Sequence, residues 1–349
     1  MMKMARLTFL LMLAFLRPHA WLSFAADASG ASAHEAATVP YQVETVKFDW
    51  ADQKRDRKVP VKIYYPKDGK GPFPVIIFSH GLGGSRDGYE YLGRYWAGHG
   101  YVSVHVQHAG SDSAVWQGVP ADEVKPALEK AILDPQNIRN RPLDVTFAID
   151  QVVKLNQGDA TFKGRLDLDH IGTAGHSFGA FTTLAIAGQV FAKPRGGSLS
   201  WADPRVKAAI AMSPSVPRNK NRLDESFSKI KIPCLHMTGT LDDSPVGDTK
   251  AADRRLPFDH INGADQFLVT FKEGDHMVFS GRLPGEAARE KDALFQNLIC
   301  LGSTAFWDAY LKDDAKAKEW LTDNGFETAL NDDGKFEKKL LPAPVKSKN

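Results

Sequence analysis

Ser177 lies in a pentapeptide whose residue types and spacing favour nucleophilic chemistry. The sequence reads Gly175-His176-Ser177-Phe178-Gly179, which has the form G-x-S-x-G. An apolar stretch, IGTA, precedes it, and a run typical of a helix, FGAFTTLAIAG, follows it. A serine at the apex of a strand-to-helix turn needs small neighbours because the backbones approach closely there. The two glycines supply that room, so we predict that Ser177 is a nucleophile.

A serine hydroxyl needs a base that takes its proton. His276 is the best candidate, because it follows the last apolar run of the chain, in QFLVTFKEGDHMVF. His176 neighbours the serine in sequence, but its side chain points away on the turn, and we expect it to be a packing residue. His80 precedes a glycine-rich loop, and we expect it to brace that loop. The sequence therefore predicts His276 as the catalytic base.

A third residue should orient the imidazole and stabilise its charged form. Asp242 and Asp243 lie in TGTLDD, after an apolar run and between Ser177 and His276. The chain order Ser, Asp, His is typical of one large hydrolase fold. We predict Asp242 by its offset from Gly239, with Asp243 as the alternative. Asp275 is less favoured because side chains of adjacent residues diverge.

The negative oxygen of a tetrahedral intermediate needs hydrogen-bond donors. The N–H of Phe178, directly after the serine, is one candidate. The loop His80-Gly81-Leu82-Gly83-Gly84 contains glycines, which allow close approach of backbone to ligand. We predict the Leu82 N–H as the second donor, with Gly83 possible. The alternative is that the loop is a simple turn.

Short apolar runs recur along the chain and alternate with stretches of helical spacing. The runs, typical of strands buried on both faces, are Pro74–Phe78, Val102–Val106, Ile171–Ala174, Val206–Met212, Pro233–Met237 and Gln266–Phe271. Val43–Trp50 and Lys58–Tyr65 predict an antiparallel pair at a sheet edge. The helical stretches are Tyr89–His99, Pro142–Asn156, Phe178–Gly188 and Glu286–Leu311. The sequence therefore predicts an α/β fold, a mainly parallel sheet with helices on both faces.

One long connection, His108–Arg141, departs from this alternation. It contains Trp116 and a possible helix at Ala121–Ile132. Long connections in compact domains are often functional. We interpret this one as a partial cap over the site, with Trp116 and Gly83 contacting the substrate. A plain surface excursion is the alternative.

The first 26 residues have the pattern of a secretory signal. Lys3 and Arg6 precede an apolar run at Leu7–Leu16, and small residues at Ser23–Ala26 suit cleavage. The run is too short for a bilayer, which needs about 20 apolar residues. We predict a secreted or periplasmic protein without stable membrane insertion.

The remaining chain is predicted to hold one catalytic domain. A flexible leader at 27–40 precedes the domain at 41–315, which includes the cap insertion at 108–141. A C-terminal extension follows at 316–349, lysine-rich and without periodicity beyond Leu330, and we expect it to be mobile at its end.

Charge and cysteine content exclude some classes of protein. The formal net charge is +2, and loss of the three basic residues of the signal leaves −1. That charge supplies no strong field for nucleic acid. The two cysteines, Cys234 and Cys300, cannot form a disulfide-dominated scaffold. They could form one bridge or be two buried thiols.

The motifs GHSFG, HGLGG, TGTLDD and GDHMVF together resemble secreted α/β-hydrolases. They are most similar to the branch of dienelactone hydrolases, platelet-activating-factor acetylhydrolases and bacterial cutinase-like polyester hydrolases, over about residues 41–312. The resemblance implies the α/β-hydrolase fold and ester hydrolysis through an acyl-enzyme, with no metal or organic cofactor. It departs from dienelactone hydrolases at Ser177, where that family has cysteine. The long connection at 108–141 argues against a polymer substrate.

The leading hypothesis is a serine hydrolase that cleaves small-molecule carboxylic esters with short or medium acyl chains. Alternative enzymes are a lipase or phospholipid acetylhydrolase at a lipid surface, and a polyester hydrolase. A peptidase is less favoured because no repeat domain precedes the hydrolase domain. A non-catalytic binding protein on the same fold is a further alternative. It would not react with an organophosphonate at Ser177. Nothing in the sequence defines an oligomeric state.

Overall fold

The computed structural model describes residues 39–193, 196–217, 219–281 and 287–342. The predicted signal peptide and all but the last two residues of the predicted leader lie outside the described residues. The first residue of the expected helix at Glu286–Leu311 also lies outside them. The described helix there, α7, spans Asp292–Leu311.

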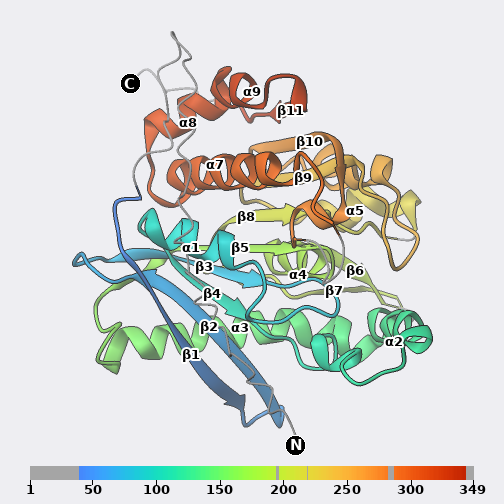
Figure 1. The fold of residues 1–349 in the computed structure, drawn as a ribbon, viewed down its shortest axis with the longest axis horizontal. Helices are drawn as coiled ribbons and strands as arrows, with labels where there is room; N and C mark the ends of the chain where they lie inside the picture. The colour runs from blue at the N-terminus through green and yellow to red at the C-terminus, as the bar shows by residue number, and fades with distance from the viewer. Residues whose placement is uncertain (1–38, 194–195, 218, 282–286, 343–349) are drawn as a thin grey trace, which may run out of the picture. The chain divides into compact units, whose positions relative to one another are not determined.

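One sheet runs through the described part of the chain (Figure 1). Its strands, in spatial order, are β1 (Val43–Asp52), β2 (Arg57–Pro66), β4 (Val102–Val106), β3 (Phe73–Ser79), β5 (Leu166–His176), β8 (Val206–Met212), β9 (Cys234–Leu241), β10 (Gln266–Asp275) and β11 (Gly334–Lys339). The strands from β4 to β10 pair in parallel. The pairs β1–β2, β2–β4 and β10–β11 are antiparallel. The predicted mainly parallel sheet with an antiparallel edge pair is confirmed.

Helices cover both faces of this sheet. On one face lie α1 (Glu90–Gly98) and α7, with α8 (Ala315–Thr322) and α9 (Gly325–Leu330) outside α7. On the other face lie α3 (Pro135–Gly158), α4 (Phe178–Ala187), α5 (Leu223–Phe227) and α6 (Leu256–His260). A smaller sheet pairs β6 (Val190–Ala192) with β7 (Ser198–Ser200). The predicted layers are those of the α/β-hydrolase fold.

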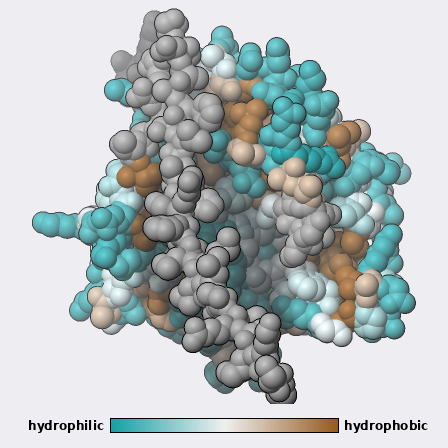
Figure 2. All heavy atoms as spheres, viewed as in Figure 1, coloured by the Kyte–Doolittle hydropathy of each residue, from teal (hydrophilic) through white to brown (hydrophobic). Residues whose placement is uncertain are grey.

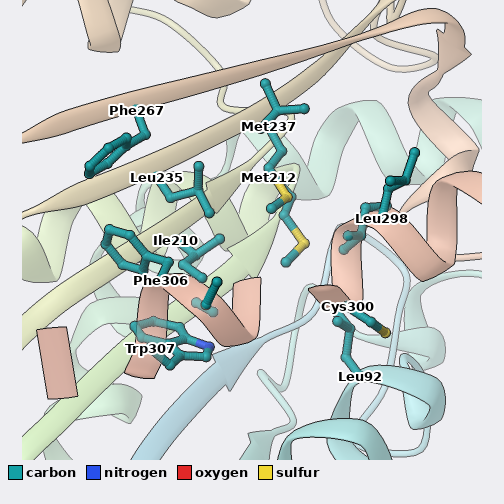
Figure 3. Close-up of a cluster of buried hydrophobic side chains, with 14 of the residues drawn as sticks. Leu92, Ile210, Met212, Leu235, Met237, Phe267, Leu298, Cys300, Phe306 and Trp307 are labelled. Atoms are coloured by element: carbon teal, nitrogen blue, oxygen red, sulfur yellow. The ribbon is translucent and has the colours of Figure 1, made fainter. Parts of the chain in front are cut away.

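Along each central strand, successive side chains point to opposite faces of the sheet and belong to different hydrophobic cores. On β8, Ile210 and Met212 pack toward α7, whereas Ala209 and Ala211 pack toward α4. Figure 3 shows Ile210 among the aromatic side chains of α7. Burying one such large apolar side chain contributes about 1.5–3 kcal/mol. Helices cover both faces of the sheet, so most residues of a central strand are buried. This is why the strands appear in the sequence as continuous apolar runs.

The two cysteines lie in different cores. Cys234 belongs to the cluster on the α4 face, and Cys300 to the cluster on the α7 face, near Leu92 (Figure 3). Both are buried free thiols. The sheet between them prevents the bridge that the sequence left open.

Helix α3 begins seven residues before the predicted start at Pro142. The expected helix at Pro142–Asn156 was therefore too short at its N-terminal end. Asp134 caps the helix by accepting a hydrogen bond from the N–H of Gln136 at 2.8 Å, and Pro135 occupies the first turn. The predicted cap insertion at 108–141 therefore ends in a helix of the main fold. Its own structure is a 3-10 turn at Ser113–Val115 and α2 (Ala121–Leu133).

The C-terminal extension has regular structure where none was expected. Beyond Leu330, β11 pairs with β10 in an antiparallel register, for example Phe336 opposite Val269. Within β11 only Phe336 is apolar, so the sequence shows almost no strand pattern. The strand is thus recognised from its pairing with β10 at the end of the sheet and not from its own residue pattern.

The surface bears no continuous apolar face in the view shown. In Figure 2 the described surface is mostly hydrophilic, with hydrophobic residues in separate patches. Among the described residues, no helix is both long enough and apolar enough to cross a bilayer.

Candidate active site

Ser177 stands at the turn between β5 and α4, with φ 56° and ψ −115°. A positive φ is rare for a residue with a side chain, and such strain is often held at functional sites. A Cβ at Gly179 would collide with the carbonyl oxygen of Ser79, and one at Gly175 with the backbone of Gly179. Both positions therefore require glycine. The turn holds Ser177, partly exposed, at the carboxyl edge of the sheet.

Asp242 and His276 follow the neighbouring parallel strands β9 and β10. Nδ1 of His276 lies 2.7 Å from Oδ1 of Asp242. The other oxygen of Asp242 accepts hydrogen bonds from the hydroxyls of Ser213 at 2.6 Å and Thr238 at 2.8 Å. These bonds fix a fully buried carboxylate in one orientation. It can therefore hold the imidazole with Nδ1 protonated, which leaves Nε2 as the base.

The imidazole of His276 lies beside the turn that carries Ser177. Its ring packs against the ring of His176, with 4.6 Å between centroids. His176 also packs on Phe279 and bonds to the hydroxyl of Tyr89 through Nδ1 at 2.8 Å. Burial and the nearby His276 hold the pKa of His176 well below its usual range. The structure thus gives His176 the packing position that the sequence analysis predicted.

The two alternative carboxylates have other partners. Asp243 is exposed and pairs with Lys250 at 2.8 Å. Asp275 accepts a hydrogen bond from the N–H of Met277 at 3.0 Å and pairs with Arg289 at 2.9 Å. Asp242 is the carboxylate that the structure brings to His276.

Arg254 is a site residue that the sequence analysis missed. Its guanidinium donates to the backbone oxygens of Asp242 at 2.9 Å and Ser213 at 2.7 Å. It also lies 3.3 Å from Oδ1 of Asp242 and 3.3 Å from Nδ1 of His276. Burial lowers the pKa of Arg254, and Asp242 opposes that effect. Its neighbour Arg255 is partly exposed and pairs with Asp259 and Glu337 instead. Nothing in the sequence distinguishes these two arginines.

The two backbone N–H groups predicted to bind an oxyanion make no hydrogen bond to another residue in the described ranges. Phe178 begins α4, so its N–H has no acceptor within the helix. The N–H of Leu82 makes no hydrogen bond to another residue in the described ranges. The N–H of Gly83 instead donates to the carbonyl of Ser111 at 2.9 Å. Of the two donors considered in this loop, the structure favours Leu82.

His80 braces the loop that carries Leu82. Its Nε2 accepts a hydrogen bond from the N–H of His108 at 3.0 Å, so its Nδ1 can donate to the carbonyl of Gly81 at 2.6 Å. Burial and the nearby charge of Arg141 hold the pKa of His80 well below its usual range. A neutral imidazole can make both bonds.

Arg141 joins the two segments that carry the free N–H groups. Its buried guanidinium donates to the backbone oxygen of His80, to Ser111 Oγ at 2.9 Å and to Thr182 Oγ1 at 2.9 Å. It also lies over the ring of Phe178, 4.5 Å from the centroid. Burial lowers the pKa of Arg141 to about 9. One side chain therefore fixes the loop and the start of α4 together.

Arg141→Met is expected to lower kcat for ester hydrolysis by about 10–100-fold, because misplacing catalytic groups by 1 Å can cost that much. KM should change less, since the variant leaves the substrate-lining surface in place. Steady-state kinetics with p-nitrophenyl butyrate, on protein shown to be folded by circular dichroism, measures this change. Arg205→Met removes the ion pairs of Arg205 with Asp203 and Asp150 and is the matched control. A folded Arg141→Met protein with unchanged kcat would contradict the positioning role.

The predicted cap segment packs on the glycine-rich loop that carries Leu82. Nε1 of Trp116 donates to the carbonyl of Gly83 at 2.7 Å, and a Cβ at Gly83 would press on Trp116 and Leu128. Gly83 has φ 72°, which favours glycine. The structure thus brings together Trp116 and Gly83, the two residues predicted to contact substrate. Their contact with substrate stays a prediction.

No metal site accompanies these residues in the described ranges, where no group of three or more His, Cys, Asp or Glu side chains could hold an ion.

Comparison with known proteins identifies the family. The sequence matches the family described as platelet-activating factor acetylhydrolase, isoform II, over residues 50–237. This chain belongs to that family. The matched region contains Ser177, Leu82 and Arg141, and it ends before Asp242 and His276.

Curated relatives are similar to the chain at low identity. The chain is 25% identical to a platelet-activating factor acetylhydrolase of Cavia porcellus, over 75% of this chain and 63% of that protein. It is 28% identical to one of Canis lupus familiaris, over 32% of this chain and 31% of that protein. It is 25% identical to cutinase est1 of Thermobifida alba, over 52% of this chain and 46% of that protein. The chain thus matches less than two thirds of the length of these relatives.

Proposed function

We propose that this family member is a serine carboxylic ester hydrolase for short to medium acyl esters. The observation that carries the proposal is the buried Asp242–His276 pair, 2.7 Å apart, beside a strained turn that presents Ser177. A nucleophile, an oriented base and two free backbone donors are the parts that acyl transfer requires. The names of the relatives, acetylhydrolase and cutinase, support the same class of reaction.

The proposed mechanism assigns one role to each group. Ser177 Oγ attacks the ester carbonyl while Nε2 of His276 takes its proton. The N–H groups of Leu82 and Phe178 bind the oxyanion. Asp242 stabilises the imidazolium, which then gives its proton to the departing alcohol and leaves an acyl-serine. Water, deprotonated by His276, attacks the acyl-serine and releases the acid.

An organophosphonate and a series of p-nitrophenyl esters test this function. A fluorophosphonate is the organophosphonate used, and we expect it to add one phosphonyl group at Ser177. Peptide mass spectrometry locates the modified residue. The protein is expected to hydrolyse the acetate and butyrate esters faster than the palmitate ester. A peak at long chains would favour the lipase alternative. No labelling and no hydrolysis would favour a non-catalytic binding protein.

Secretion is part of the proposal and rests on residues 1–26 alone. The basic start, the apolar run and the small residues near Ala26 support cleavage of a signal peptide.

A further inference from the structure

A cavity of about 290 Å³ lies beside α4, on the face of the sheet opposite α7. Phe181 of α4, Val190 and Phe191 of β6, and Val216 and Pro217 after β8 form its apolar walls, and uncharged polar residues such as Gln189 and Ser215 complete the lining. Two charged residues at its lining, Arg222 and Glu225, pair with each other at 2.6 Å. The cavity therefore suits an uncharged apolar group.

An aromatic row connects this cavity to the proposed nucleophile. Phe178 directly follows Ser177, and its ring centroid lies 5.6 Å from that of Phe181. Phe181 lies 5.4 Å from Phe191, which lies 5.0 Å from Trp201. The segment after β8 also begins at the nucleophile, because the N–H of Ser177 donates to the carbonyl of Met212 at 2.9 Å. One wall of the cavity comes from α4, which begins directly after Ser177. The other comes from the segment after β8, which begins next to the residue bonded to Ser177.

The imidazole of His276 reaches the turn through His176, on the α7 side of the sheet. His276 contacts His176, which packs on Phe279, a residue of the core beneath α7. A separate groove of about 270 Å³ beside His276 is lined by Leu241, Asp275 and Arg289, among others. A carbonyl carbon bound to Ser177 Oγ would therefore lie between the groove and the cavity.

The proton transfers determine which part of an ester occupies each space. The leaving oxygen must lie within hydrogen-bond reach of His276, because the imidazolium protonates it. The alcohol part then extends into the groove beside His276. The acyl chain, on the opposite side of the carbonyl carbon, extends along Phe181. We propose that the cavity walled by Phe181, Phe191 and Val216 binds an uncharged alkanoyl chain of the substrate. This inference rests on the proposed ester hydrolysis and adds its selectivity for the acid part.

Two series of esters distinguish the two spaces. In p-nitrophenyl alkanoates, from acetate to decanoate, only the acyl chain changes. In alkyl acetates, from ethyl to octyl, only the alcohol changes. Each methylene buried in the cavity should raise kcat/KM by about fourfold, equivalent to about 0.8 kcal/mol. The rise should stop where the chain fills the cavity.

Val216→Phe narrows the cavity and Phe191→Ala enlarges it. We expect Val216→Phe to lower the octanoate-to-acetate ratio of kcat/KM at least tenfold, and Phe191→Ala to move the optimum to longer chains. Neither variant should change the ranking of the alkyl acetates. Leu241→Phe, in the groove, should change that ranking instead. Leu294→Ser, at an exposed position of α7, is the control and should change neither series.

The outcomes separate this inference from the proposed function. If the cavity variants change the alkyl acetate series, the cavity holds the alcohol and the inference is wrong. If folded variants leave both series unchanged while a phosphonate still labels Ser177, the cavity is no part of the site. If the unmodified protein hydrolyses no ester of either series, the proposed function itself fails.

Discussion

Ser177→Ala is expected to lower kcat for p-nitrophenyl butyrate by about 10⁴-fold or more, by analogy with other catalytic triads. The variant removes the oxygen that forms the acyl-enzyme, whereas the donors at Leu82 and Phe178 stay. Alanine is smaller than serine, so the strained turn between β5 and α4 should keep its geometry. The burst of p-nitrophenol and the steady-state rate, both measured at saturating ester, quantify the loss.

The control for this experiment is a serine outside the site. Ser228→Ala changes an exposed residue after α5 and should keep kcat within about twofold of the unmodified protein. Phosphonate labelling should also disappear in Ser177→Ala and persist in Ser228→Ala. Equal hydrolysis by the Ser177→Ala variant and the unmodified protein would exclude the proposed mechanism.

Asp242→Asn is expected to lower kcat by about 10⁴-fold, the loss seen when the acid of such a triad is replaced by an amide. An amide nitrogen next to Nδ1 favours the tautomer with its proton on Nε2, and that tautomer cannot accept the serine proton. The change also leaves Arg254 buried without the carboxylate that lies 3.3 Å away. Kinetics with p-nitrophenyl butyrate, together with a thermal unfolding curve, separate the loss of rate from the loss of stability.

Asp243→Asn is the matched control, since it makes the same chemical change one residue further along the chain. Asp243 is exposed and pairs with Lys250 at 2.8 Å, and exposed pairs contribute about 0–1 kcal/mol. We expect kcat to stay within about threefold of the unmodified protein, because Asp243 bonds to Lys250 and not to the imidazole, although it lies at the rim of the groove beside His276. A larger loss in Asp243→Asn than in Asp242→Asn would reassign the acid.

Two buried arginines support the two halves of the proposed site. Arg254 holds the ends of the segments that carry Asp242 and Ser213, on the acid–base side. Arg141 holds His80 and Thr182 and covers Phe178, on the oxyanion side. A guanidinium can donate in several fixed directions at once, so it suits a site where several loops must keep one arrangement.

Strands buried on both faces were predictable, because each leaves a short apolar run. The predicted runs Val102–Val106 and Val206–Met212 coincide with β4 and β8. The hairpin β6–β7 was not predicted, since its three-residue strands are too short to show a period. β11 was missed because a single apolar side chain, Phe336, joins it to the core.

The amino-acid sequence by itself determined the position of Ser177. The turn at Ser177 needs neighbours without a Cβ, and Gly175 and Gly179 supply them within the same pentapeptide. Only the tertiary structure decided which carboxylate reaches His276 and which N–H of the glycine loop stays free. Asp242 and Asp243 are identical in type and adjacent, and they differ only in the partners that other segments bring to them. Burial of Arg141 and Arg254 likewise depends on contacts between segments far apart in the chain, for which no sequence pattern exists.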